Sequence, residues 1–386
     1  MKNFIPFTME RMMSKLEHEV DFNLSESGVH PMLLEELLGE DRANLEELLA
    51  TDLNYPHANG TPGLRRNISA LYEGAAPENV LVTVGAIEAN YLAITTLLDP
   101  GDELAVMAPN YMQIWGVAQN SGVKVRTFGL KENEGWTLDT EELEAAVSPA
   151  TKMIAVCNPN NPTGRILDDE EMNAIVRSAE SVGAWILADE VYAGAERERE
   201  RETQSFFGLY DKVLAIGSMS KAYGLPGLRT GWAVGDEAVI DEMWARHEYL
   251  AISTAMLSNK LTELALSEEV RPRIIARTRE YIRSGFPVFE NWMAEQEGLF
   301  NYTAPDAAAI AFVRYNLDIN STEFVERLVR EKSVLIVPGD HFGIDNHIRV
   351  SYGLPHAYLR DALGRIRELF DEVRAEKAES KGASTA

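Results

Sequence analysis

A single lysine, Lys221, stands among small and polar residues in the stretch "GSMSKAYGLPGLRTGW", residues 217–232. Two neighbouring serines, Ser218 and Ser220, and Arg229 add hydroxyl groups and a guanidinium group near that amine. Hydroxyl and guanidinium groups suit a phosphate, and a lysine amine can form a Schiff base with a carbonyl carbon. The stretch therefore predicts a site for a phosphorylated carbonyl compound.

Three further motifs stand where apolar, strand-like runs end. Gly85 leads from "VTV" into a helical pattern, and the free amides that begin a helix after a glycine bind phosphate readily. Asp189 ends the run "AWILAD", where a carboxylate is costly without a cationic partner. The third motif is "NPNNPTG", residues 158–164. Each motif also has a structural interpretation: an ordinary turn into a helix, a carboxylate satisfied by a helix N-terminus or an arginine, and a Pro/Asn turn.

Together the motifs describe one ligand with a phosphate, an aldehyde, a protonatable ring nitrogen facing a carboxylate, and an oxyanion that meets an amide and a phenol. Pyridoxal 5′-phosphate has all four. With "NPNNPTG", "DEVY" and "SMSKAYGLPGLRTGW" in this order and spacing, the chain resembles the class I/II aminotransferases of the fold type I pyridoxal-phosphate enzymes. The resemblance covers essentially the whole chain.

The resemblance implies a role for each matching residue. Lys221 would hold the cofactor aldehyde and move the proton between Cα and C4′, and Asp189 would keep the pyridine nitrogen protonated. Tyr192 and Asn161 would donate hydrogen bonds to the phenolic oxygen of the ring. The remaining cofactor contacts implied are Gly85, the backbone amides of Ala86 and Ile87, the side chains of Ser218, Ser220 and Arg229, and the stacked ring of Tyr111.

The resemblance also implies how the substrate and a second subunit meet the site. Arg349, in "HIRVSYG", would grip the substrate α-carboxylate with its planar fork. Tyr55 would reach the phosphate of the other subunit's cofactor, which implies a homodimer with shared active sites. The loop "NLSESGVHP" would close over the substrate, and its residues that bear on specificity, beside Asn161, are Glu26, Ser27, Gly28 and His30.

The chain departs from the family pattern at three places. Many relatives have a polar side chain at the position of Ile87, and the loop has Ser27 where a glycine usually stands, with Gly28 following. No second arginine is identified for a distal carboxylate, because Arg314 lies in a strand-like run and is expected to face solvent. A preference for aspartate or glutamate is therefore unproven.

Three functions are weighed. The first is transfer of an amino group between an L-α-amino acid and a 2-oxo acid, through aldimine, quinonoid and ketimine intermediates. The second resembles the capreomycidine-synthase-like sub-group and is lyase or cyclase chemistry at Cβ or Cγ of a guanidino amino acid, whose cation could face Glu26. The third is a non-enzymatic pyridoxal-phosphate-binding regulator, which would need an additional basic domain. A dinucleotide-binding dehydrogenase is excluded because no G-x-G-x-x-G follows the first strand.

The elements that position these motifs alternate. Strand-like runs and amphipathic helical segments follow one another from about residue 60 to 235, which predicts an α/β fold with a mainly parallel, seven-stranded type of sheet between helices. Site residues of such a sheet gather beyond the carboxyl ends of its strands. We expect a large cofactor-binding domain at 46–275, a smaller α/β domain built from 1–45 and 276–375, and a flexible tail at 376–386.

Composition limits the partners. The net charge of −25 and the lack of a basic patch argue against nucleic acid and anionic membranes. The amino terminus does not resemble a signal peptide, and no run is long enough for a membrane span, so a cytoplasmic protein with small-molecule substrates is expected. The only cysteine, Cys157, lies in an apolar run, and is interpreted as a core residue. No metal site is expected.

Two other segments receive structural interpretations. The methionines around Met9 and Met13 form a stripe at helical spacing, which predicts a packing face against this chain or a partner subunit. The charged segment "AERERERET", residues 195–203, is interpreted as a solvated surface turn in which Glu196 would lie beside Arg199 or Glu200.

Overall fold

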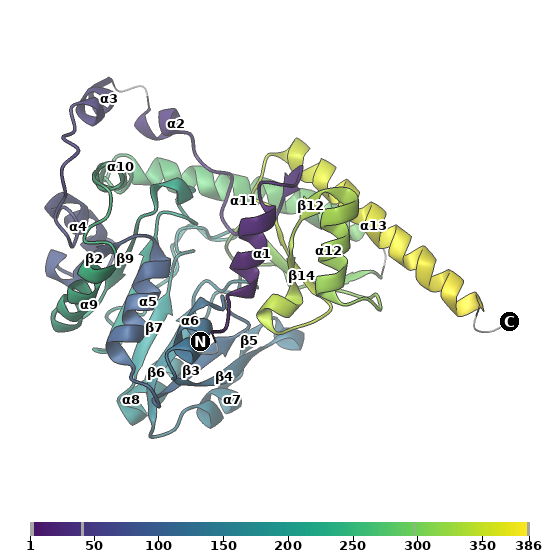
Figure 1. Ribbon diagram of the computed structural model, residues 1–386, viewed down its shortest axis with the longest axis horizontal. Helices are drawn as coiled ribbons and strands as arrows, with labels where there is room; N and C mark the ends of the chain where they lie inside the picture. The colour runs from purple at the N-terminus through teal and green to yellow at the C-terminus, as the bar shows by residue number, and fades with distance from the viewer. Residues whose placement is uncertain (1–3, 40–41, 297, 384–386) are drawn as a thin grey trace.

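The computed structural model describes residues 4–39, 42–296 and 298–383, and within them it is an α/β fold with one large and two small sheets (Figure 1). The larger sheet has eight strands among these residues, in the spatial order β2 (Val80–Thr83), β9 (Gly231–Val234), β8 (Val213–Ser218), β7 (Trp185–Asp189), β6 (Thr151–Cys157), β3 (Glu103–Ala108), β4 (Lys124–Lys131) and β5 (Thr137–Leu138). Strands β4, β3, β6, β7 and β8 are parallel, whereas β9 is antiparallel to both of its neighbours. The carboxyl ends of the five parallel strands therefore meet at one edge.

Helices cover both faces of this sheet because its strands are apolar on both sides. Leu104 and Val106 of β3 pack with α5 (Ala86–Leu97), α6 (Gln113–Asn120) and α9 (Glu237–Leu250). Ala105 and Met107 point to the other face and pack with α7 (Thr140–Ala146) and α8 (Asp169–Val182). The alternation follows from the period of two in a strand.

The smaller sheets combine segments that lie far apart in the chain. An antiparallel sheet has the order β10 (Phe300–Asn301), β11 (Ile310–Tyr315), β14 (His347–Ser351) and β13 (Val337–Pro338), and β1 (Phe22–Asn23) pairs in parallel with β12 (Val334–Leu335). The remaining helices are α1 (Thr8–Leu16), α2 (Leu34–Leu38), α3 (Arg42–Leu49), α4 (Pro62–Ser69), α10 (Met256–Ala265), α11 (Arg271–Ala294), α12 (Ser321–Lys332) and α13 (His356–Ala383). Helix α1 lies between the part with the large sheet and the part with the small sheets (Figure 1).

The methionine stripe is a packing face. Of the two predicted surfaces that it could pack against, this chain or a partner subunit, the structure shows this chain. Met9 and Met13 of α1 are buried and pack in the same cluster as Met107 of the large sheet. Because α1 also reaches the small sheets, these side chains help to close the space between the two parts.

Several sequence-based predictions were incomplete. Strands β4 and β9 were not predicted. In β4, "KVRTFGLK", exposed charged residues interrupt the apolar pattern because the strand lies near the edge of the sheet. The flexible tail was expected from residue 376, but α13 continues to Ala383, since this segment is rich in helix formers and Glu376 pairs with Arg327 at 2.9 Å. Residues 384–386 of that predicted tail lie outside the described residues.

The interpretation of residues 195–203 as a solvated turn was wrong at Glu196, near the start of the segment, whereas residues 198–201 are exposed as expected. Glu196 is fully buried, and its carboxylate lies 2.6 Å from the guanidinium of Arg279 on α11. It also accepts hydrogen bonds from the backbone and the hydroxyl of Thr203. Glu196 therefore anchors this segment to α11 instead of pairing with its sequence neighbours, because a buried carboxylate needs a cationic partner.

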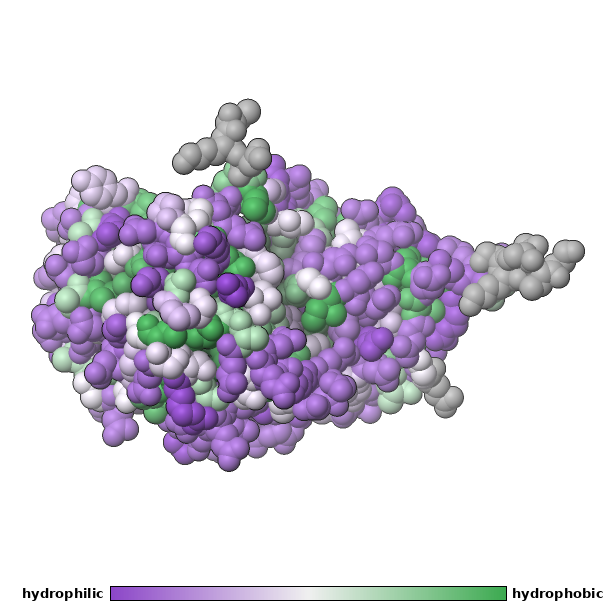
Figure 2. Space-filling view, turned by 90° about the horizontal axis from the view of Figure 1, so that it is seen from below, coloured by the Kyte–Doolittle hydropathy of each residue, from purple (hydrophilic) through white to green (hydrophobic). Residues whose placement is uncertain are grey.

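The outer surface agrees with the acidic composition. The face in Figure 2 is mostly hydrophilic and is interrupted by separate hydrophobic patches. No helix among the described residues is long and apolar enough to cross a membrane.

Candidate active site

A cavity of about 290 Å³ opens where the parallel strands end, between the large sheet, helix α1 and strand β14. It brings together most of the residues singled out in the sequence, which come from positions as far apart as 26 and 349. The predicted residues that line it are Glu26, Ser27, Ala86, Ile87, Tyr111, Asn161, Asp189, Tyr192, Ser218, Ser220, Lys221, Arg229 and Arg349.

Four predicted residues do not line the cavity. Gly85 directly precedes helix α5. Gly28 lies against the backbone of Lys221, and a Cβ added to Gly28 would be 3.1 Å from the carbonyl oxygen of Ser220. His30 is exposed beyond the loop, with its ring centroid 5.9 Å from that of Tyr281. Tyr55 is 76% exposed, so this chain alone does not bring it to the site.

Asp189 is the buried carboxylate of the site and ends strand β7. Its Oδ2 accepts a hydrogen bond of 3.0 Å from Nδ2 of Asn90 on α5, and its Oδ1 accepts one of 3.4 Å from the backbone of Val191. Burial raises the pKa of Asp189, and these hydrogen bonds together with the charge of Lys221 oppose the shift. A cationic group that enters the cavity beside Asp189 would therefore find a carboxylate with no ion pair among the described residues.

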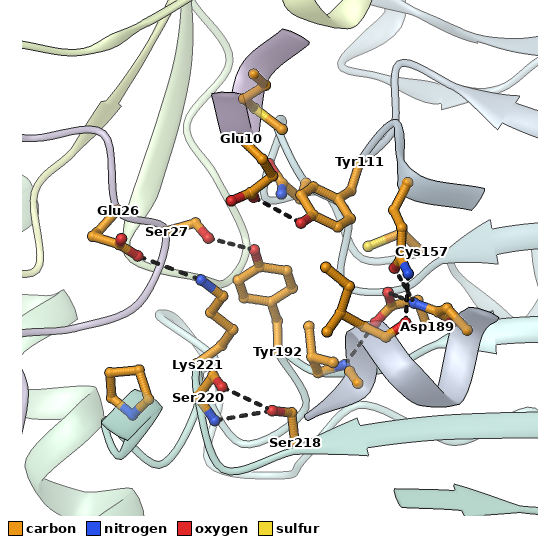
Figure 3. Close-up of a pocket in the computed structure, with 18 of the residues that line it drawn as sticks. Glu10, Glu26, Ser27, Tyr111, Cys157, Asp189, Tyr192, Ser218, Ser220 and Lys221 are labelled. Carbon is orange, nitrogen blue, oxygen red and sulfur yellow. Dashed lines mark hydrogen bonds and ion pairs between the residues drawn. The ribbon is translucent and has the colours of Figure 1, made fainter. Parts of the chain in front are cut away.

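Lys221 lies opposite the N-terminal loop. Its Nζ is 3.6 Å from Oε2 of Glu26, and the side chain is only 25% exposed (Figure 3). The amine thus projects into the cavity from the loop that follows β8, where an adjoining electrophile would be within its reach.

Two tyrosine hydroxyls line the same cavity as this amine. Tyr192 donates a hydrogen bond of 2.8 Å to Oγ of Ser27, and Tyr111 donates one of 2.7 Å to Oε1 of Glu10 on α1 (Figure 3). Burial raises the pKa of both phenols well above the usual range. Both phenols are therefore hydrogen-bond donors near neutral pH.

A corner lined by hydrogen-bond donors forms where β2 turns into α5. Gly85 has a φ of +76°, and a Cβ added to it would lie 2.8 Å from Nη2 of Arg229. Ser218 accepts a hydrogen bond of 3.0 Å from the backbone of Ser220, and both hydroxyls line the cavity with Ala86 at the helix start. Free helix amides, hydroxyls and a guanidinium are donors that suit a phosphate.

Arg349 is the buried cation of the site. It projects from β14, its Nη1 donates to Oδ1 of Asn161 at 2.9 Å, and its Nη2 donates to the carbonyl oxygen of Ser25. Its Nε has no hydrogen-bond partner among the described residues. Burial lowers the pKa of Arg349, and Tyr192, Glu26 and Glu10 oppose that shift. A carboxylate entering the cavity would supply the anion that this guanidinium lacks.

Besides Cys157, seven residues that line the cavity were not predicted as site residues: Met9, Glu10, Met13, Asn90, Gln113, Val191 and Pro226. Only the methionine stripe offered a signal, and it indicated packing rather than a site. Asn90 stands in the middle of a helical pattern, and its contact with Asp189 spans 99 residues. Cys157 is buried in the core, as expected, and its backbone position at the end of β6 also brings it to the cavity wall.

Comparison with known proteins gives consistent matches over most of the chain. A family model described as aminotransferase class I and II matches residues 40–366. The chain is 30% identical over 351 residues to capreomycidine synthase from Streptomyces vinaceus, covering 90% of this chain and 89% of that protein. It is 30% identical over 341 residues to an aspartate aminotransferase from Streptomyces avermitilis, covering 83% and 82%. The crystal structure of a PLP-dependent aminotransferase from Streptococcus suis 89-1591 matches with a TM-score of 0.89 and 30% identity, covering 96% of this chain and 99% of that one.

Proposed function

The chain belongs to the class I and II aminotransferases, and from this premise we propose that it moves an amino group between an L-α-amino acid and a 2-oxo acid. The cofactor of the family is pyridoxal 5′-phosphate. The observation that carries the proposal is that the Lys221 amine, the Asp189 carboxylate and the Arg349 guanidinium project into one cavity from three different elements.

The residues present fit this cofactor. The corner at Gly85 leaves room that a Cβ would fill, and it is bounded by the guanidinium of Arg229 and the hydroxyls of Ser218 and Ser220, which would hold the phosphate. Asp189 would pair with the protonated ring nitrogen. When bound, the cofactor withdraws electrons from the substrate Cα and so makes its proton removable.

The chain's own residues divide the remaining work. Lys221 would bind the aldehyde carbon of the cofactor. Once released from it, the Lys221 amine would take the proton from the substrate Cα and deliver it to C4′. Tyr192 and Asn161 would donate hydrogen bonds to the phenolic oxygen of the ring. Arg349 would hold the substrate α-carboxylate in a bidentate pair, which fixes the direction in which the Cα proton points. Helix α1 would restrict access of water to the cavity.

We also propose a homodimer with shared sites. Tyr55 is a large aromatic residue that is 76% exposed, and exposed hydrophobic residues near it in the chain include Leu49 and Leu53. A surface of this kind favours burial against another subunit. In a dimer Tyr55 would reach the phosphate in the partner's cavity, and size-exclusion chromatography with light scattering would measure the expected mass of two chains.

The proposal is tested by removing the amine. Lys221→Ala should abolish amino transfer to a panel of 2-oxo acids, and borohydride treatment should no longer attach the cofactor covalently to the protein. Lys212→Ala is the matched control, because the Lys212 amine lies outside the cavity and donates a hydrogen bond to the carbonyl oxygen of Gly183. Amino transfer that survives in Lys221→Ala would refute the proposal.

A second function is favoured by the similarity to capreomycidine synthase and by the position of Glu26 in the cavity. In lyase or cyclase chemistry at Cβ or Cγ, the same residues would remove the Cα proton, but no 2-oxo acid would be consumed. Single-turnover absorbance separates the two functions. Transfer leaves the amine form of the cofactor on the enzyme, whereas lyase or cyclase chemistry returns it to Lys221.

A further inference from the structure

We propose that the site selects an L-amino acid whose side chain carries a positive charge, either a guanidinium or an ammonium group. The inference rests on the function proposed above and names its substrate class. It starts from the charges in the cavity. Among the described residues, the charged side chains that line it are Lys221, Arg229, Arg349, Asp189, Glu10 and Glu26.

Four of these charges are used by the cofactor and by the part common to all amino acids. Arg229 faces the phosphate, Lys221 the aldehyde and Asp189 the ring nitrogen. Arg349 faces the α-carboxylate. The two carboxylates of Glu10 and Glu26 remain, because the α-amino group of the substrate is used in the bond to the cofactor aldehyde carbon.

Glu26 loses its partner when the cofactor binds. Its ion pair is with Lys221, at 3.6 Å, and the proposed function engages that nitrogen with the cofactor. The Glu26 side chain is 48% exposed and comes from a loop that lines the cavity, so it has room to adjust to substrate side chains of different length. A substrate cation would replace the charge of Lys221.

Glu10 has a neutral partner. Its Oε1 accepts a hydrogen bond of 2.7 Å from Tyr111, which leaves the second oxygen available, and no ion pair of Glu10 occurs within the described parts of the chain. Glu10 and Glu26 line the same cavity as Arg349, and the negative charges of both oppose the fall in the pKa of its guanidinium. Once the substrate α-carboxylate neutralises Arg349, the two glutamates, both labelled in Figure 3, would leave this region negative.

An acidic side chain would meet the opposite situation. It would face both carboxylates, and each cation lining the cavity already has a partner in the loaded site. Arg314, the other arginine considered from the sequence, is exposed on β11 and does not line the cavity. The charge balance therefore discriminates against aspartate and glutamate.

The test measures binding of amino acids to cofactor-loaded Lys221→Ala, which cannot complete the transfer, through the absorbance of the cofactor. L-Arginine is compared with L-citrulline, which has the same length but a neutral urea group, and L-lysine with L-norleucine; L-aspartate is the acidic member. We expect arginine or lysine to bind at least about tenfold more tightly than its neutral counterpart, which is about 1.4 kcal/mol, and aspartate to bind most weakly. The same order of kcat/KM is expected in the wild-type enzyme, where Lys221 is present.

Glutamine substitutions test the two carboxylates separately. Glu10→Gln and Glu26→Gln should each reduce the preference for the cation about three- to tenfold and leave citrulline or norleucine binding unchanged, because glutamine removes only the charge. At position 10, glutamine also keeps the hydrogen-bond acceptor for Tyr111. Glu19→Gln, on an exposed residue outside the cavity, is the matched control and should keep the full preference.

The possible failures are distinguishable. Equal binding of charged and neutral amino acids, tightest binding of aspartate, or an unchanged preference in both glutamine variants would overturn the inference and leave the proposed function standing. If no amino acid changes the absorbance of the cofactor-loaded protein, the proposed function itself is wrong and the inference fails with it.

Discussion

Replacing Gly85 by alanine should weaken cofactor binding through Arg229. The φ of +76° at Gly85 costs a side chain about 1–3 kcal/mol of strain. In addition, the new Cβ would lie 2.8 Å from Nη2 of Arg229, so the guanidinium must move. A charged hydrogen bond contributes about 1.5–3 kcal/mol, and losing the one to the phosphate should raise the cofactor Kd about 10- to 150-fold.

The matched control is Gly74→Ala. Gly74 has a similar φ of +81°, but an added Cβ there would meet nothing within 4 Å. Both variants should therefore unfold at lower temperature than the wild type, and only Gly85→Ala should lose affinity for pyridoxal 5′-phosphate. Absorbance titration of the cofactor-free protein gives Kd, and differential scanning calorimetry gives Tm. An unchanged Kd in Gly85→Ala, or an equal loss in Gly74→Ala, would refute the assignment of the phosphate corner.

Three other predictions concern buried ionisable side chains. Asp189→Asn should lower kcat/KM at least about 100-fold, because breaking a buried charged pair costs about 3–5 kcal/mol, while the cofactor should still bind through its phosphate. Steady-state kinetics measures kcat/KM, and a loss below tenfold would contradict the role of Asp189. Burial raises the pKa of Glu190 from 4.5 to about 8, so the folded chain holds a proton that the unfolded chain releases, and the unfolding free energy should fall as pH rises through that window. Thermal unfolding of the cofactor-free protein at about pH 5 and about pH 9 should show a smaller fall in Glu190→Gln, and the same fall in both proteins would count against a buried proton. Arg279→Met should destabilise the fold by about 3–5 kcal/mol because it leaves Glu196 buried without its cation. In urea unfolding, the double variant with Glu196→Gln should recover part of this loss of stability. A double variant no more stable than Arg279→Met would argue against the ion pair.

The sequence predicted features that depend on neighbouring residues. Continuous apolar runs such as "AWILAD" indicated buried parallel strands, since both of their faces are covered, and β7 is buried along most of its length. Strand β4 was missed because a strand near the edge carries charged residues that interrupt the pattern. Glu196 was misinterpreted because an alternating run of charges looks the same whether or not an arginine from α11 pairs with one of its members.

The sequence by itself determined the fold class, the family and the positions along the chain where chemistry was expected, because turn glycines, strand-end carboxylates and the lysine among serines are local patterns. Only the tertiary structure showed that Glu10, one of the chain's 61 acidic residues, also reaches the cavity. Glu10 meets Tyr111 across 101 residues and Arg349 meets Asn161 across 188. No local pattern marks such contacts, because they arise when α1 and β14 pack over the ends of the parallel strands. The substrate class that we infer depends on those contacts.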